Sequence, residues 1–122
     1  MASVILAFGA LWCAVAVAAG AFGAHALADR LDARSLELWE TAARYLMFGG
    51  LGAALVGIAA VQWPRDGFLY AGLGLLVGGL VFSGTVGAIA LGAPRWLGAV
   101  TPLGGLLMIA GFLLFAWTAL RL

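Results

Sequence analysis

The sequence has no lysine, one cysteine, one histidine and few charged residues of any kind. Only 9% of its 122 residues are charged, and the formal net charge is +1. A soluble domain carries roughly 25% charged residues, so this composition excludes a water-soluble globule. The six basic residues are all arginines and form no run that would neutralise a row of phosphates. We therefore expect no nucleic-acid partner.

The scarcity of reactive side chains also limits the chemistry. Cys13 alone makes neither an internal disulfide nor a thiolate metal cage. It lies within an apolar segment, so we interpret it as a packing residue, with redox chemistry or palmitoylation as alternatives. The sequence has no nucleophile–base arrangement, no phosphate-binding loop and no metal-ligand spacing. We therefore predict no catalytic residue, no cofactor, no metal site and no enzymatic activity.

Long apolar stretches dominate what is present, since 66% of the residues are hydrophobic. A helix that crosses the hydrocarbon of a bilayer needs about 20 mostly apolar residues. Four stretches meet this length, at about residues 4–24, 45–61, 68–91 and 97–120. The first is longer than the apolar part of a signal peptide and follows no basic residue, so we expect a retained helix. The prediction is an all-α, polytopic membrane protein: one compact bundle of four transmembrane helices over residues 1–122.

The charged residues lie between or beyond these spans, most of them in a polar connector at about residues 25–44. Glu40 and Arg44 are spaced i,i+4 with the acid first, so we expect the second helix to begin near Ser35, outside the hydrocarbon. Arg44 would extend its guanidinium to the interface. The arginine distribution favours first and third connectors in the cytoplasm.

Glycine and alanine recur at helical spacing in every span. Small residues let two helix backbones approach closely, which is how helices associate in lipid. Ala16, Gly20 and Ala24 form one such ridge, and Gly49, Ala53 and Gly57 form another. The predicted helix-packing glycines are Gly20, Gly23, Gly49, Gly57, Gly74, Gly78, Gly84, Gly104, Gly105 and Gly111. The ridges would face other spans or a second copy of the chain.

Polar groups within or at the ends of the spans are few. His25, Ser83, Thr85 and Thr101 would form a ligand site or a packing cluster if the fold brings them together. His25 has two interpretations: a proton-sensitive or ligand-contacting group, or a helix-end residue that bonds to free carbonyl groups. For the hydroxyl groups the alternative is a bond to the helix backbone or to a neighbouring helix.

Three segments resemble a known family when taken together. They are Gly20-Ala21-Phe22-Gly23-Ala24-His25, Leu80-Val81-Phe82-Ser83-Gly84-Thr85 and Thr101-Pro102-Leu103-Gly104-Gly105. In this order they resemble the domain of unknown function 423 family, which is similar to eukaryotic transmembrane protein 256. The resemblance implies four-helix membrane proteins without an established activity, and here a bacterial cytoplasmic membrane.

The chain departs from the family pattern in two places. Relatives have a Tyr-Gln-x-x-His pattern early in the second span, where this chain has Tyr45 followed by Leu46 and Gly49. An aromatic residue often follows the Phe-Ser-Gly motif, where this chain has Gly87. A basic C-terminal tail in relatives implies termini in the cytoplasm, opposite to the arginine distribution. Apart from the resemblance, Pro102 fits the first turn of a helix and Thr101 its N-cap.

Two functions are compatible with these features. The first is a non-enzymatic structural or accessory component of a larger membrane complex or a homo-oligomer, with membrane lipids around it. The alternative is a protein that binds a lipid or a small hydrophobic molecule, or a minimal transporter that works as an oligomer. A lipid or an ordered water beside the polar cluster would favour the alternative.

Overall fold

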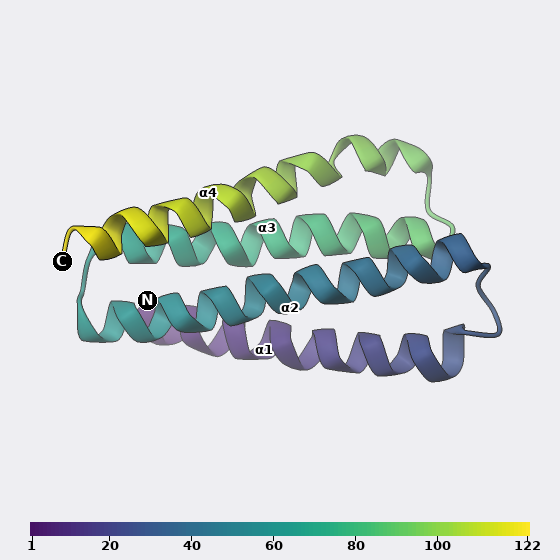
Figure 1. Cartoon of the computed structure of the whole chain (residues 1–122), viewed down its shortest axis with the longest axis horizontal. Coiled ribbons are helices and arrows are strands. Elements are labelled where there is room, and N and C mark those ends of the chain that lie inside the picture. The colour runs from purple at the N-terminus through teal and green to yellow at the C-terminus, as the bar shows by residue number, and fades with distance from the viewer.

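A computed structural model describes all 122 residues, and it contains helices and no strand. The chain forms four long helices, α1 to α4. Figure 1 shows that each runs antiparallel to its neighbours along the chain. Their bounds are α1 Ala2–Phe22, α2 Ala33–Gln62, α3 Asp66–Ala90 and α4 Thr101–Leu120. A short π-helical segment, η1 Gly23–Leu27, continues α1, and a 3-10 segment, η2 Arg95–Ala99, precedes α4. The predicted fold class is confirmed.

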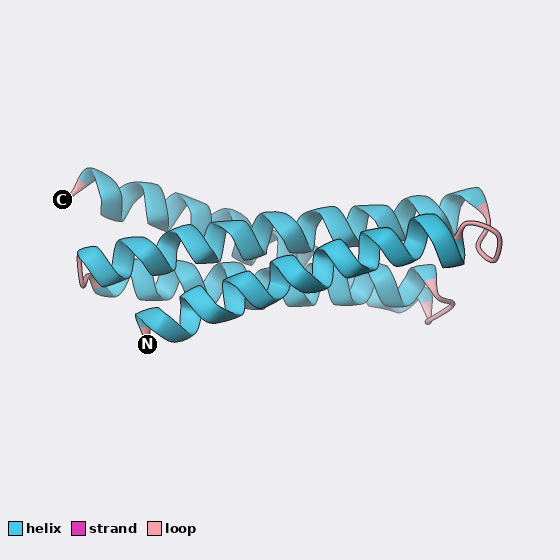
Figure 2. Ribbon diagram, turned by 90° about the horizontal axis from the view of Figure 1, so that it is seen from below, coloured by secondary structure: helices cyan, strands magenta, loops and turns pink.

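Each helix packs mainly on its neighbour in the chain. Contacts are extensive between α1 and α2, between α2 and α3, and between α3 and α4. Contacts between α1 and α3 and between α2 and α4 are sparse, and α1 does not reach α4. The bundle is therefore an open row of helices (Figures 1 and 2), and it leaves one groove between α1 and α3 and another between α2 and α4.

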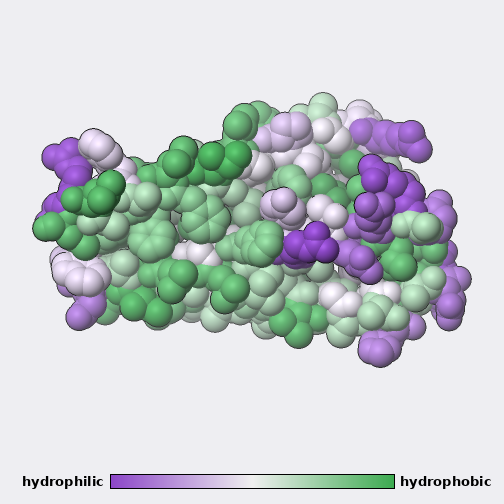
Figure 3. Space-filling view, viewed as in Figure 1, coloured by the Kyte–Doolittle hydropathy of each residue, from purple (hydrophilic) through white to green (hydrophobic).

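All four helical segments are long and apolar enough to cross a membrane, over Ala2–Leu27, Ala33–Gln62, Asp66–Ala90 and Arg95–Leu120. Apolar residues cover most of the surface in Figure 3, and hydrophilic residues gather towards the two ends, most of all at the end with the first and third connectors. One strongly hydrophilic patch lies nearer the centre of this face. The wide apolar surface is what contact with lipid chains requires.

Local hydrogen bonds and one glycine determine where α2 begins and where α3 ends. The second helix begins at Ala33, close to the predicted start near Ser35, and Asp32 caps it by accepting a hydrogen bond from the Ser35 N–H at 2.7 Å. At the end of α3, Gly92 has a φ of 104°, and the Ala93 N–H donates to the Ala88 carbonyl at 2.9 Å. This glycine cap ends the helix and turns the chain towards Pro94.

The start of α4 differs in one respect from the prediction. Pro102 does lie in the first turn, where its missing N–H costs nothing. Thr101, however, is the first helical residue and caps no N–H group, so its predicted N-cap role is wrong. Its hydroxyl oxygen instead lies 2.6 Å from the hydroxyl oxygen of Thr85 and 3.3 Å from the Leu97 carbonyl oxygen of η2.

Close backbone approach holds the helices together. A Cβ on Gly78 of α3 would lie 2.7 Å from the Gly104 carbonyl oxygen of α4, nearer than real Cβ contacts allow. Between α1 and α2, a Cβ on Gly9 would lie 2.6 Å from the Ala54 nitrogen, and one on Gly50 would lie 2.8 Å from the Gly9 oxygen. These contacts give the dense van der Waals packing on which association in lipid depends.

The predicted glycines differ in what they contact. Close approaches also occur at Gly23, Gly49, Gly57, Gly74 and Gly111, whereas Gly105 has ordinary van der Waals spacing. Gly20 and Gly84 contact no other helix of this chain, because no atom lies within 4 Å of the place where their Cβ would stand. For these two glycines, packing on a second copy of the chain stays a prediction. The ridge of α1 that packs on α2 contains Gly9, which the four-residue spacing did not select, so Gly20 is left exposed.

Candidate functional site

The predicted cluster of four polar residues is divided in the structure. Thr85 and Thr101 meet at the α3–α4 contact, with their hydroxyl oxygens 2.6 Å apart. Ser83 lines a groove on the side of α3 that faces α1 and α2. His25 lies in η1, exposed and without a hydrogen bond. The prediction of one shared site is therefore wrong, because residues 83 and 85 project from different sides of the same helix.

The two threonines have a structural arrangement. The Thr85 hydroxyl lies 2.8 Å from the Val81 carbonyl and 3.1 Å from the Phe82 carbonyl of its own helix. Because it also meets Thr101, the pair is fully engaged in joining α3 to the start of α4. Such a pair offers little free hydrogen-bonding capacity to a ligand.

The groove beside Ser83 is the main hollow on the α1 side of the row. It has a volume of about 290 Å³ and lies among α1, α2 and α3. Ala42, Ala43 and Gly87 form a buried floor, while Val15 and Leu80 at its sides are exposed. The remaining lining residues are Ala19, Trp39, Leu46, Gly84, Ala88 and Leu91. The groove therefore opens sideways to the place where lipid chains would lie.

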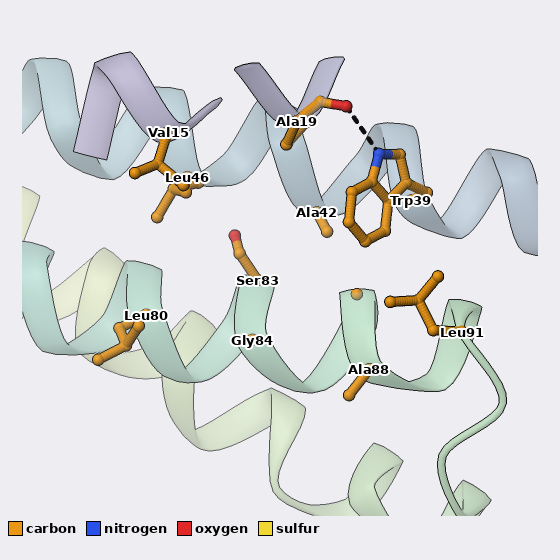
Figure 4. A pocket seen from close by; sticks show the side chains of 12 residues that line it. Val15, Ala19, Trp39, Ala42, Leu46, Leu80, Ser83, Gly84, Ala88 and Leu91 are labelled. Atoms are coloured by element: carbon orange, nitrogen blue, oxygen red, sulfur yellow. Dashed lines mark hydrogen bonds between the residues drawn. The ribbon is translucent and has the colours of Figure 1, made fainter. Parts of the chain in front are cut away.

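Two indole groups mark the ends of this groove. The Trp39 Nε1–H of α2 donates to the Ala19 carbonyl of α1 at 2.8 Å, beside the first connector (Figure 4). Towards the other end of the bundle, the Trp12 Nε1–H of α1 donates to the Leu76 carbonyl of α3 at 3.0 Å. The first bond holds α1 against α2 and the second holds α1 against α3. Between these two points α1 and α3 stay apart.

Space for Trp39 comes from Gly23. A Cβ on Gly23 would lie 2.6 Å from Trp39 Cδ1, so only glycine fits there. On the α3 side, a Cβ on Gly87 would lie 3.7 Å from Trp39 Cζ3, an ordinary contact. Trp39 thus forms a wall of the groove at its interfacial end, a position that suits an amphipathic indole.

Ser83 is the only polar side chain in the groove besides Trp39. Its residue is 7% exposed, and its hydroxyl oxygen is buried with no hydrogen-bond partner. Figure 4 shows the hydroxyl directed from α3 into the space between α3 and the pair α1–α2. A buried hydroxyl without a partner is costly, and such groups are rare in proteins. The Ser83 hydroxyl is thus the one polar side-chain group of the groove that has no hydrogen-bond partner in the protein.

The sequence contained some signal for this site. Ser83 is one of the few polar residues within the predicted spans, whereas no motif of the sequence marks Trp39 as part of a site. The Gly23–Trp39 fit was not predicted, because it joins two helices whose rotation depends on the whole bundle. Gly87 was noted only as a departure from the family pattern.

Two further hollows lie elsewhere. An apolar groove of about 530 Å³ between α2 and α4 is lined by Tyr45, Phe82, Met108 and Phe112 among others. A polar hollow near the connectors contains Asp32, Arg34 and Arg95, so its charges are of mixed sign. No three side chains of histidine, cysteine, aspartate or glutamate gather at ligand distance for a metal ion.

Comparison with known proteins identifies the family of the chain. The family described as protein of unknown function DUF423 matches residues 19–105, which include Ser83, Trp39 and the Thr85–Thr101 pair. The chain belongs to the DUF423 family. The family resemblance expected from the three sequence motifs is confirmed.

Bacterial relatives of this DUF423 protein cover nearly its full length. A UPF0382 membrane protein of Staphylococcus epidermidis is 39% identical over 97% of this chain and 96% of its own. The UPF0382 membrane protein YwdK of Bacillus subtilis is 32% identical over 97% of both chains. A UPF0382 membrane protein of Staphylococcus haemolyticus is 41% identical over 87% of this chain and 86% of its own. No solved structure matches the chain.

These relatives and the four apolar helices identify the DUF423 chain as a multi-pass integral membrane protein. The bacterial cytoplasmic membrane is its location, as expected from the sequence.

Proposed function

We propose that this DUF423 protein is a binding protein of the membrane, which takes an apolar molecule from the bilayer into the α1–α3 groove. The observation that carries this proposal is the Ser83 hydroxyl, buried and unpartnered in an otherwise apolar groove. The role is binding without catalysis, since the groove has no acid, base or nucleophile arrangement.

The shape of the groove supports the same role. Ligand sites are typically concave and mostly apolar, with a small number of placed polar groups, and have volumes of about 300–1,000 Å³. The groove is near the lower limit of that range at about 290 Å³. Its floor is buried and its sides are exposed, so a molecule dissolved in lipid would enter without crossing the bundle.

Two glycines provide a matched pair of variants. Gly84 lines the groove and has open space at its Cβ position, so Gly84→Leu would fill the groove without a clash at Cβ. Gly20 of α1 has the same open space but does not line the groove, so Gly20→Leu is the control. We would purify both variants and the parent from native membranes in mild detergent and weigh them by native mass spectrometry.

The parent and Gly20→Leu should retain a bound apolar molecule, visible as added mass, and Gly84→Leu should lose it. Equal added mass on all three proteins, or none on the parent, would contradict the binding role.

A second candidate is the accessory component or homo-oligomer expected from the small-residue ridges. The observation that favours it is the exposed Gly20, which has no neighbour within the chain and would admit a helix of another chain. In the same mass spectra, a copy number that falls in Gly20→Leu would support this candidate, and a parent that is monomeric and alone would remove it.

A further inference from the structure

We infer that Ser83 recognises a neutral oxygen, either a carbonyl or a hydroxyl, on the apolar molecule that occupies the groove. This inference rests on the binding role proposed above and specifies the ligand chemistry. It follows from the state of the Ser83 hydroxyl, the lack of charge around it and the size of the groove.

The hydroxyl of Ser83 is free for a ligand because no group of the protein uses it. A serine or threonine within a helix commonly bonds to the carbonyl four residues earlier, as Thr85 does to Val81 at 2.8 Å. The Ser83 oxygen has no such bond, although it is buried. The only other polar side-chain group of the groove, the Trp39 N–H, is already used by the Ala19 carbonyl.

A water molecule is a poor occupant for the same reason. A buried water needs two to four polar partners. The groove provides one free side-chain partner among mainly hydrophobic residues. An apolar molecule with one hydrogen-bonding oxygen matches that lining, because its body would contact the apolar walls and its oxygen would pair with Ser83.

The ligand should be neutral. None of the residues that line the groove is an aspartate, glutamate, lysine, arginine or histidine. An ionised group would therefore lose its hydration without gaining a counter-charge, which is strongly unfavourable. A molecule with several polar groups would likewise leave some of them without a partner.

The position of Ser83 admits two sources of this chemistry. It lies about two turns from the Ala90 end of α3, about 10 Å along the helix axis. At this depth a neutral oxygen could come from the ester of a glycerolipid or from an alcohol or ketone dissolved in the hydrocarbon. A volume of about 290 Å³ admits a small molecule or one part of a larger one.

The test compares naphthalene with naphthol, which has the same ring system and one added hydroxyl group. The full-length protein, labelled with fluorotryptophan and placed in lipid nanodiscs, is titrated with each probe. Fluorine NMR reports on Trp39, a wall of the groove, and its resonance is assigned with Trp39→Phe. Ser83→Ala removes only a hydroxyl without a partner, so it should fold normally, which a thermal melt checks.

Both probes should shift the Trp39 resonance, and naphthol should bind roughly fivefold tighter, as one net hydrogen bond predicts. Ser83→Ala should lose this preference and bind naphthalene as the parent does. Nanodiscs of ester-linked and ether-linked lipid separate the two sources. If the Trp39 resonance of the parent differs between the two kinds of disc, and that of Ser83→Ala does not, the oxygen belongs to a lipid ester. If the resonance is the same in both discs and the parent prefers naphthol, the oxygen belongs to a dissolved molecule.

Two results would overturn the account at different levels. Ser83 does not recognise a neutral oxygen if Ser83→Ala keeps the full preference for naphthol. The same conclusion follows if the parent protein shows neither a preference for naphthol nor a difference between ester-linked and ether-linked lipid. In both cases the groove would still bind the probes. If neither probe shifts Trp39 in any disc, the proposed binding role itself fails.

Discussion

The indole nitrogen of Trp39 lies 2.8 Å from the carbonyl oxygen of Ala19, and this bond joins α2 to α1 at the interfacial end of the groove. Both residues line the groove, so the bond sets the separation of two of its walls. The same indole fills the space that Gly23 leaves, with 2.6 Å between Trp39 Cδ1 and the place of a Cβ on Gly23. The shape of the site therefore depends on one aromatic side chain and one glycine.

Gly23→Ala should displace Trp39 and break its bond to Ala19. The added methyl group meets the indole ring, and overpacking of this kind costs about 1–3 kcal/mol. We expect a lower midpoint of thermal unfolding in detergent and a changed Trp39 fluorine resonance. Gly20→Ala is the control, since its methyl group meets no atom within 4 Å. Equal behaviour of the two variants would show that Gly23 does not position the indole.

The α3–α4 contact should be equally sensitive to small additions. A Cβ on Gly78 meets the backbone oxygen of Gly104 at 2.7 Å, and backbone cannot move aside as a side-chain tip can. Gly78→Ala should therefore cost about 1–3 kcal/mol. Gly105→Ala is the matched control on α4, because its nearest neighbour would be at 3.6 Å. Thermal unfolding followed by circular dichroism measures both, and a tolerated Gly78→Ala would mean that the helices are further apart.

Thr85 and Thr101 should couple energetically across the α3–α4 contact. Their oxygens are 2.6 Å apart, and hydrogen bonds between membrane helices are worth about 0.6 kcal/mol on average. A double-mutant cycle with Thr85→Val and Thr101→Val should give a coupling energy near that value. Additive effects of the two substitutions would show that the hydroxyl groups do not interact.

The first turn of α2 should weaken in acid. The backbone N–H of Ser35 donates to Asp32 and, together with the side-chain contact to Ser35, lowers the pKa of that carboxyl group. The carboxylate therefore stabilises the folded turn fully above the ordinary aspartate pKa of about 3.9. This stabilisation is lost as the pH falls through the lower pKa of the folded state.

Hydrogen exchange at the Ser35 amide measures this effect, expressed as protection relative to the unfolded chain. Protection should decrease in acid in the parent and stay constant in Asp32→Asn, which keeps an acceptor that does not titrate. The same acid response in both proteins would exclude Asp32 as the cause.

The sequence was sufficient to predict the four helices, because length and apolar composition alone decide whether a helix can cross a bilayer. Four apolar stretches of sufficient length predicted four helices, and the structure has them. The cap by Asp32 was not predicted, because it depends on the extended backbone conformation of Asp32 at the end of the connector. The first and fourth spans extend a few residues further towards the connectors than expected, because η1 and η2 lengthen them.

The site was harder to predict because it depends on helix rotation. Ser83 and Thr85 are neighbours in sequence, yet one faces a groove and the other faces α4. The small-residue ridge through Gly20 was a sound pattern on α1, but α2 packs instead against the face with Gly9. Spacing within one helix does not reveal which of its faces meets another helix.

The most direct test of the binding account is photolabelling in the membrane. A long-chain alcohol that carries a diazirine would be incorporated, activated by light, and mapped by mass spectrometry of the digested protein. We expect adducts concentrated on groove residues such as Ala19, Ala43 and Ala88, lost in Gly84→Leu and retained in Gly20→Leu. Adducts spread evenly over the exposed apolar faces, and unchanged by Gly84→Leu, would contradict the account.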